Sequence, residues 1–435
     1  MGWKRDALKS FLTLVAVCGV TMQSLSQGHA QYSSSPTSEV QAVGESEGIA
    51  TGESATTIIP SLRLAERYDS NVFFSPGVNF EDYVTTVSPQ VRVNHRNQWV
   101  EGIVGGGATG EVYVNNPGLN YVGGNGIVDL NLERAMNTLV RGLGLRISDS
   151  ISYTPQPPAF AAPTAGSQLS ETIVQGLQAR RANSISNQAR VAASYFFSPY
   201  MGVTSTYTDT RIRFGRGVST PTGIVASGEF INTNYQTLSS GLEGRPSPAD
   251  TISLSHQYRK ATFAEPARED RGFSTQGVMA RWSRAITPSI EGMLEGGFSV
   301  VSRGGGVYPV GGGSLEWRGQ STTITVSYSR GIAPSFLFTA TALLSQHVTG
   351  SVTRQIAEDL SLSVSGNYAI NQSIPDSSLV RFESFSVTPA IQYKMGPNLR
   401  ATLSYARNGF QRSFVGQSLD FNRNVVMLNF LYEWR

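Results

Sequence analysis

Cysteine is nearly absent from the sequence. The single cysteine, Cys18, lies within the first 30 residues, which have the features of a secretion signal. Without that segment the chain has no cysteine, which excludes a disulfide, a thiolate metal site and a cysteine nucleophile from the mature protein. A cysteine-free chain also suits passage through an oxidising periplasm.

Charged residues are scarce as well. They make up 15% of the chain, well below the quarter or so that is usual in globular domains. Beyond the N-terminal segment the only lysines are Lys260 and Lys394, so arginine carries almost all of the positive charge. The net charge is only +3, and no basic cluster is interleaved with aromatic residues, which argues against a nucleic-acid partner.

Long hydrophobic runs are missing too. After the signal, no run of about 18 apolar residues occurs that could form a membrane-spanning helix. The mean hydropathy is slightly negative, at -0.15. A membrane protein with this composition must distribute its apolar residues in alternation, which is the weak signature of β-barrel strands.

The sequence offers little that could support catalysis or metal binding. His95, His256 and His347, the histidines beyond the signal, are too far apart for a metal-binding pattern. His256 shares the apolar parity of its segment, as does the histidine of outer-membrane phospholipases, but Tyr258 stands where those enzymes place a serine. The glycine runs at 105–110 and 304–313 lack the ending of a phosphate-binding loop and are typical of bends or crowded barrel positions. We therefore expect no enzyme, no metal and no cofactor.

The chain divides into three segments. Residues 1–30 have a positively charged start, an apolar core and small residues at a cleavage site, which predicts a signal peptide. Residues 31–55 are polar and lack apolar periodicity, which predicts a disordered periplasmic tail. From residue 56 to 435 the chain alternates apolar and polar residues, which predicts a single all-β outer-membrane barrel.

The C-terminal segment 424–435 carries the clearest strand pattern. Alternate positions form one wholly apolar face that ends in aromatics, while Asn429 and Glu433 lie on the other face. We expect this strand to close the barrel against the first strand and to face the membrane with five residues, namely Val426, Leu428, Phe430, Tyr432 and Trp434.

Short and long connections alternate between the strand-like segments. Eight short connections, one of them at 134–138, alternate with nine longer ones, and together they join about 18 antiparallel strands. The longer connections include 115–125, 411–420 and the longest, 154–187. That loop is interpreted either as a lid or constriction of the pore or as a surface loop.

The residues that alternate with the membrane-facing ones along each strand are expected to line the lumen. They include polar and charged residues that could bind an anionic or hydroxyl-rich solute, because arginine binds carboxylates through paired hydrogen bonds. The alternative is that arginines and carboxylates pair across strands and fill the interior. The candidates are Arg63, Arg67, Arg92, Arg146, Arg190, Arg259, Arg281, Arg400, Asp129, Glu133, Glu291, Glu295 and Glu316.

Several stretches resemble a family of outer-membrane β-barrel porins associated with exopolysaccharide synthesis and export in Gram-negative bacteria. They are residues 61–75, 82–91, 318–330 with 333–335, and 352–362. The resemblance covers most of residues 58–435 and implies a channel that secretes a polysaccharide with the help of a periplasmic export partner.

Three functions stay open at this stage. The first is exopolysaccharide secretion across the bacterial outer membrane, and the second is an uptake porin or a barrel that sheathes a partner protein. The third is a structural or adhesive protein with a filled lumen. In each case we expect the barrel to contact outer-membrane lipid and lipopolysaccharide.

Overall fold

The computed structural model describes residues 54–74, 79–154, 182–217, 231–263, 272–302, 306–335, 342–375, 380–414 and 417–434. The predicted signal peptide and nearly all of the predicted tail lie outside these residues. Ala55, the last residue of that tail, already belongs to the first strand.

The described chain consists almost entirely of strands. Two short helices occur, the 3-10 helix η1 (Pro117–Leu119) and the α-helix α2 (Glu133–Leu139). None of the helices in the described ranges is long and apolar enough to cross a membrane. The strands are β1 (Ala55–Asp69), β2 (Asp82–Arg96), β3 (Glu101–Tyr113), β4 (Tyr121–Asn131), β5 (Leu143–Thr154), β6 (Ala182–Ser198), β7 (Met201–Gly217), β8 (Thr233–Ser247), β9 (Asp250–Phe263), β10 (Phe273–Thr287), β11 (Ile290–Val301), β12 (Val307–Arg318), β13 (Thr322–Pro334), β14 (Ala342–Gln355), β15 (Leu360–Ile374), β16 (Val380–Lys394), β17 (Leu399–Phe414) and β18 (Gln417–Glu433).

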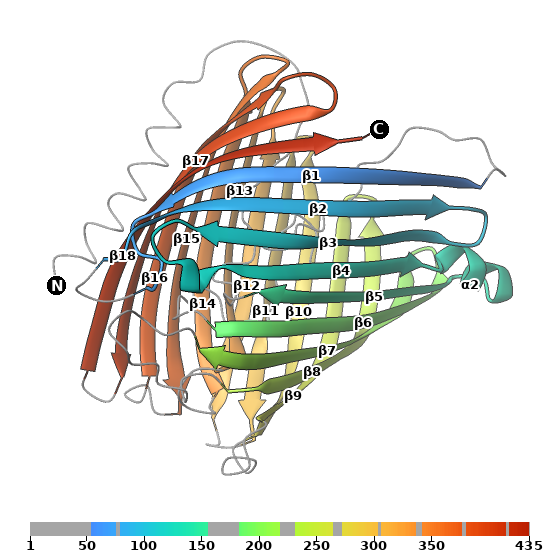
Figure 1. Cartoon of the computed structure of the whole chain (residues 1–435). Helices are drawn as coiled ribbons and strands as arrows, with labels where there is room; N and C mark the ends of the chain where they lie inside the picture. The colour runs from blue at the N-terminus through green and yellow to red at the C-terminus, as the bar shows by residue number, and fades with distance from the viewer. Residues whose placement is uncertain are drawn as a thin grey trace.

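These strands form one closed antiparallel barrel. Each strand pairs with its neighbours in sequence, and β1 pairs with both β2 and β18, so the sheet of 18 strands has no free edge. Leu64 of β1 lies opposite Phe430 of β18. Figure 1 shows β1 beside the last strand and α2 beyond the ends of β4 and β5. The predicted closure by the C-terminal strand and the predicted strand number are confirmed.

An apolar band surrounds the outside of the barrel. On β18, Val426, Leu428, Phe430 and Trp434 are exposed, and the ring of Tyr432 packs at 4.7 Å against that of Trp434. Other strands of the wall also carry exposed apolar residues at alternate positions, among them Leu64, Val91, Leu254, Leu294, Val326 and Leu403. Such a band, closed around a barrel, suits the hydrocarbon core of a membrane.

Three predicted connections differ from the structure. The loop expected at 115–125 is shorter, because β4 already begins at Tyr121. The turn expected at 134–138 is part of α2, and Glu133, which opens this helix, is exposed at the end of the barrel. Alternation along a strand does not extend into a helix, so the strand parity does not assign Glu133 to a face; its Cγ lies 3.5 Å from the position of a Cβ at Gly144 of β5. The loop expected at 411–420 is also wrong, since β17 continues to Phe414 and β18 begins at Gln417.

Glycines stand where neighbouring backbones come very close. A Cβ at Gly312 would lie 2.3 Å from the Tyr328 carbonyl oxygen, and one at Gly107 would lie 2.6 Å from that of Pro89. A side chain does not fit at such distances, so glycine permits the close approach. The glycine runs thus mark crowded positions of the wall, as the sequence predicts.

Candidate functional site

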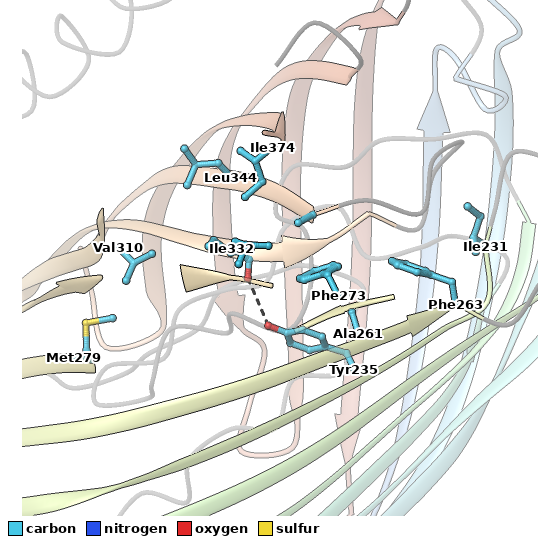
Figure 2. Packing of buried hydrophobic residues seen from close by; sticks show 12 residues of the cluster. Ile231, Tyr235, Ala261, Phe263, Phe273, Met279, Val310, Ile332, Leu344 and Ile374 are labelled. Atoms are coloured by element: carbon cyan, nitrogen blue, oxygen red, sulfur yellow. Dashed lines mark hydrogen bonds between the residues drawn. The ribbon is translucent and has the colours of Figure 1, made fainter. Parts of the chain in front are cut away.

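The lumen side of β8 is identified by a contact across the barrel. The Tyr235 hydroxyl on β8 donates a hydrogen bond of 3.5 Å to the backbone carbonyl of Ile332 on β13. In the ring, β9, β10, β11 and β12 separate these two strands, so the two residues can meet only inside the barrel. Figure 2 shows this bond among the side chains that gather around it.

Buried apolar side chains fill the lumen at one end. They form three clusters, and we call them together the apolar layer. The first cluster contains Ile231, Tyr235, Ala261, Phe263, Phe273, Met279, Val301, Val310, Ile332, Ala342, Leu344 and Ile374. The second contains Phe74, Ile212, Ala333, Leu343, Val380, Phe382, Phe410 and Phe421, and the third Val72, Phe73, Val84, Tyr113 and Leu119.

The apolar layer crosses the whole barrel. Ile212 of β7 and Phe382 of β16 belong to the same cluster, although these strands lie on opposite sides of the ring. Most members stand at strand ends that carry the longer connections, which is the extracellular end of an outer-membrane barrel. Among the described residues, the outer end of the lumen is therefore occupied by hydrophobic side chains.

The end of the β13–β14 hairpin bends into the lumen and builds part of this layer. Leu343 and Leu344 are consecutive and both buried, as are Ile332 and Ala333. Neighbouring side chains of a flat wall strand would point to opposite faces, so this part of the sheet bends inward, while Ala342, Leu343 and Leu344 stay paired with residues 372–374 of β15. The sequence signal was present in the unbroken run Ala342–Leu343–Leu344, which does not alternate.

Residues 72–74, which follow β1, reach into the same layer. Phe74 has a φ of 54°, a left-handed conformation that is uncommon for a bulky residue and costs free energy. Its ring lies 5.7 Å from that of Phe421, and the guanidinium carbon of Arg423 lies 4.6 Å from its centroid. Packing on both sides thus holds the strained residue in the lumen.

Buried ion pairs lie close to the apolar layer. Arg423 donates to both carboxylate oxygens of Asp69, with an Nε–O distance of 2.8 Å. Arg67 donates at 3.1 Å to Glu111 and at 3.1 Å to the hydroxyl of Tyr113, which itself belongs to the layer. These charges lie in a dry part of the lumen, where fixed partners replace water.

Further from the layer, the arginines of the lumen meet water. The side chain of Arg146 is 62% exposed and that of its partner Asp129 only 11%. The fractions are 54% and 8% for Arg318 and Glu316, and 26% and 4% for Arg281 and Glu295. In each of these three pairs the guanidinium faces the water and the carboxylate lies behind it.

The remaining predicted lumen residues are distributed along the wall and do not gather at one point. Arg63 donates to Asn429 at 2.9 Å, Arg400 pairs with Glu433, and Glu291 lies 3.9 Å from Arg318. Arg259 is buried and donates at 2.6 Å to Gln257, Arg92 is half-buried, and Arg190 is exposed. Of the predicted loop 154–187, residues 155–181 lie outside the described part of the chain, and residues 182–187 belong to β6.

A closed 18-stranded barrel with an apolar outer band, and with charged and small polar residues in the lumen beyond the apolar layer, is an outer-membrane β-barrel. No family model matches the chain, and neither does any curated protein. Among solved structures, the outer membrane protein opdK from Pseudomonas aeruginosa is 10% identical, with 87% of this chain and 99% of that chain covered and a TM-score of 0.46.

Two further structures give similar values. OccAB3 from Acinetobacter baumannii is 10% identical over 87% of this chain and 99% of that chain, with a TM-score of 0.44. The siderophore receptor PirA from Pseudomonas aeruginosa is 7% identical over 87% of this chain and 80% of that chain, with a TM-score of 0.44. Similarity at this level says nothing about what the channel carries.

Proposed function

We propose that the protein is an uptake channel for small hydrophilic solutes that carry negative charge, and that the apolar layer closes it at rest. The observation that carries this proposal is the exposure of the lumen ion pairs. In the pairs Arg146–Asp129, Arg318–Glu316 and Arg281–Glu295, the guanidinium is more exposed than its carboxylate partner, and within the described residues only Arg318 has an equally exposed carboxylate, Glu291, beside it at 3.9 Å.

Arginine is suited to this task because its planar guanidinium binds a carboxylate or phosphate through two parallel hydrogen bonds. These arginines, two of them exposed and Arg281 partly exposed, stand on β5, β10 and β12, so the contacts are distributed around the lumen. Separate and individually weak contacts let a solute enter and also leave, as selective pores require.

The apolar layer favours a small solute over a polymer. A polysaccharide chain would have to displace a large part of the layer at once, whereas a small solute requires only a local opening. The inward end of the β13–β14 hairpin is the element to move, because side-chain packing and the Tyr235 hydrogen bond hold it in the lumen. Its β14 strand is paired with β15 up to Ala342, so a movement of this end bends the neighbouring end of β15 with it.

Polysaccharide secretion with a periplasmic partner is the second candidate, favoured by the position of the layer. The water-exposed arginines lie on the periplasmic side of it, so the resting lumen is accessible from the compartment in which an exported polymer would arrive. In this version the arriving chain would open the layer from within.

Swelling of proteoliposomes tests the proposal. Vesicles with the full-length protein are diluted into isotonic solutions of monosaccharides, small carboxylates, small amines and a polysaccharide. Uptake predicts swelling with small solutes, fastest for carboxylates, and none with the polymer. In cells, a deletion strain that lacks surface polysaccharide but takes up small anions normally would reject uptake in favour of secretion.

A further inference from the structure

One sector of the lumen is lined by hydroxyl groups. Val326 of β13 is exposed in the apolar band, so its neighbour Thr325 points into the lumen. Register continues from Thr325 to Ser351 of β14, Ser365 of β15 and Thr388 of β16. Because opposite residues of paired strands share a face, these hydroxyls form one row across the lumen side of β13 to β16.

A second row of hydroxyls runs parallel to the first, nearer the periplasmic end. It begins with Thr323 of β13 and continues with Thr353 of β14 and Ser363 of β15, and Ala390 of β16 ends it. Neither row contains a charged residue on these strands. We call the serines and threonines of the two rows the hydroxyl wall.

The hydroxyls of this wall are free to bind a solute. All of them belong to half-buried residues, and within the described ranges none takes part in a side-chain hydrogen bond. Their neighbours toward the apolar layer differ, since Ser327 and Thr349 are buried and bond to each other at 2.5 Å. A free hydroxyl can donate one hydrogen bond and accept two, so the wall can replace the water around a hydroxylated solute.

A guanidinium lies at the edge of the hydroxyl wall. Arg318 of β12 is directly opposite Thr323, and its side chain is 54% exposed. Its partners are Glu316, which accepts from its Nε, and Glu291 at 3.9 Å, so the guanidinium keeps donors for a further acceptor. A carboxylate bound at Arg318 has Thr323 about 5 Å and Thr353 about 10 Å away, at about 4.8 Å per strand.

The opposite side of the ring mixes hydroxyls with charge. Arg190 of β6 lies between Ser148 of β5 and Thr208 of β7 in one row, and Arg146 of β5 is exposed to the lumen. The lumen thus presents arginines among hydroxyls on one side and hydroxyls alone on the other. A solute that can bond to both sides carries a carboxylate and many hydroxyl groups.

We propose that the channel selects sugar acids, which are carboxylates with hydroxyl groups on most of their carbons, and that the hydroxyl wall and Arg318 form the site that recognises them. The proposal rests on the uptake function proposed above and narrows its class of solute. A sugar acid that enters the lumen exchanges the water on its hydroxyls for the wall and keeps its hydrogen bonds. A hydrocarbon acid makes the same contact with Arg318 but has no group that bonds to the wall.

Uptake of labelled glucarate and adipate by proteoliposomes with the full-length protein tests this site. The two dicarboxylates have the same carbon chain and differ only in the hydroxyl groups of glucarate. The test variant is T323V/T353V/S363A/S365A, which removes hydroxyls of the wall with little change in side-chain size. The control is S205A/S240A, which removes two hydroxyls that bond to each other at 2.8 Å on the lipid face. Initial rates are measured at solute concentrations low enough that the rate is proportional to concentration.

The wild type and the control should take up glucarate at least about threefold faster than adipate, because one net hydrogen bond is equivalent to a factor of about two to ten. The test variant should lose this preference and keep its adipate rate, which also shows that it is folded. Equal rates for the two acids in the wild type, or a test variant that keeps the preference, would overturn the proposal and leave anion uptake standing. If neither acid enters, the uptake function fails together with it.

Discussion

Arg423 of the last strand donates hydrogen bonds to both carboxylate oxygens of Asp69 on the first strand. The shorter of the two hydrogen bonds is 2.5 Å long, and Asp69 is almost completely buried. The same guanidinium lies over the ring of Phe74, which the left-handed backbone turns into the lumen. Arg423 therefore takes part both in the contact between the first and last strands and in the apolar layer that fills the lumen.

Replacing Asp69 by Asn should destabilise the barrel, because it leaves the buried charge of Arg423 without a counter-ion. Breaking a buried pair in this way costs about 3–5 kcal/mol. The measurement is the free energy of unfolding in urea from lipid vesicles. R245Q is the control, since the Arg245–Glu243 pair is half exposed and a pair of that kind contributes about 0–1 kcal/mol. A similar loss of unfolding free energy in D69N and R245Q would contradict the conclusion that burial makes the Asp69–Arg423 pair the more important one.

Adjacent residues of β9 test the assignment of faces. Leu254 is exposed in the apolar band, whereas Ser253 lies in the lumen between Glu243 and Arg281. L254R should cost about 2–4 kcal/mol if the charge lies near the middle of the bilayer, and S253R should be tolerated. Assembly can be followed by the fraction of protein that resists denaturation on a cold gel. An equal loss of assembled protein in L254R and S253R would mean that the lipid and lumen faces of β9 are wrongly assigned.

Two adjacent glycines of β11 test the crowding of the wall. A Cβ at Gly297 would lie 1.9 Å from the Val278 carbonyl oxygen, whereas one at Gly296 would have no atom within 4 Å. G297A should therefore lower the free energy of unfolding by about 1–3 kcal/mol, as overpacking does, and G296A should leave it nearly unchanged. Thermal unfolding of the two proteins in the same detergent distinguishes them.

Charge selectivity follows from the exposed guanidiniums. In R146E/R318E the two most exposed arginines of the lumen pairs become carboxylates, so preference for anions should reverse toward cations. The measurement is the reversal potential across a planar bilayer with a salt gradient. The outward variant R284E is the control and should leave the potential unchanged. Identical potentials for all three proteins would show that these arginines do not face the conducting path.

Alternation in the sequence was sufficient to predict the wall. Val426 to Trp434 and the polar residues that alternate with them follow a period of two, and Val426, Leu428, Phe430 and Trp434 are exposed, because side chains of a wall strand alternate between its two faces. The parity could not assign Glu133 for a local reason, since a helix of seven residues replaces the expected turn and interrupts the alternation.

The apolar layer could not be derived in the same way. Tyr235 and Ile332 are separated by almost 100 residues and meet only because the closed barrel brings non-neighbouring strands to one lumen. Parity alone identifies Tyr235 as a lumen residue, but it does not reveal that the lumen is filled there. The run Ala342–Leu343–Leu344 breaks the alternation and was a local sign that the end of the hairpin bends into the lumen.

Conductance across a planar bilayer tests the central claim most directly, namely that the apolar layer closes the lumen. The full-length wild type is compared with L343A/F382A/F410A, which removes three side chains of the layer, and with L254A/V326A/L403A, which removes three from the lipid face. The account predicts a low conductance for the wild type and the lipid-face variant and a several-fold higher one for the layer variant. A wild type that already conducts like an open barrel, together with an unchanged layer variant, would contradict it.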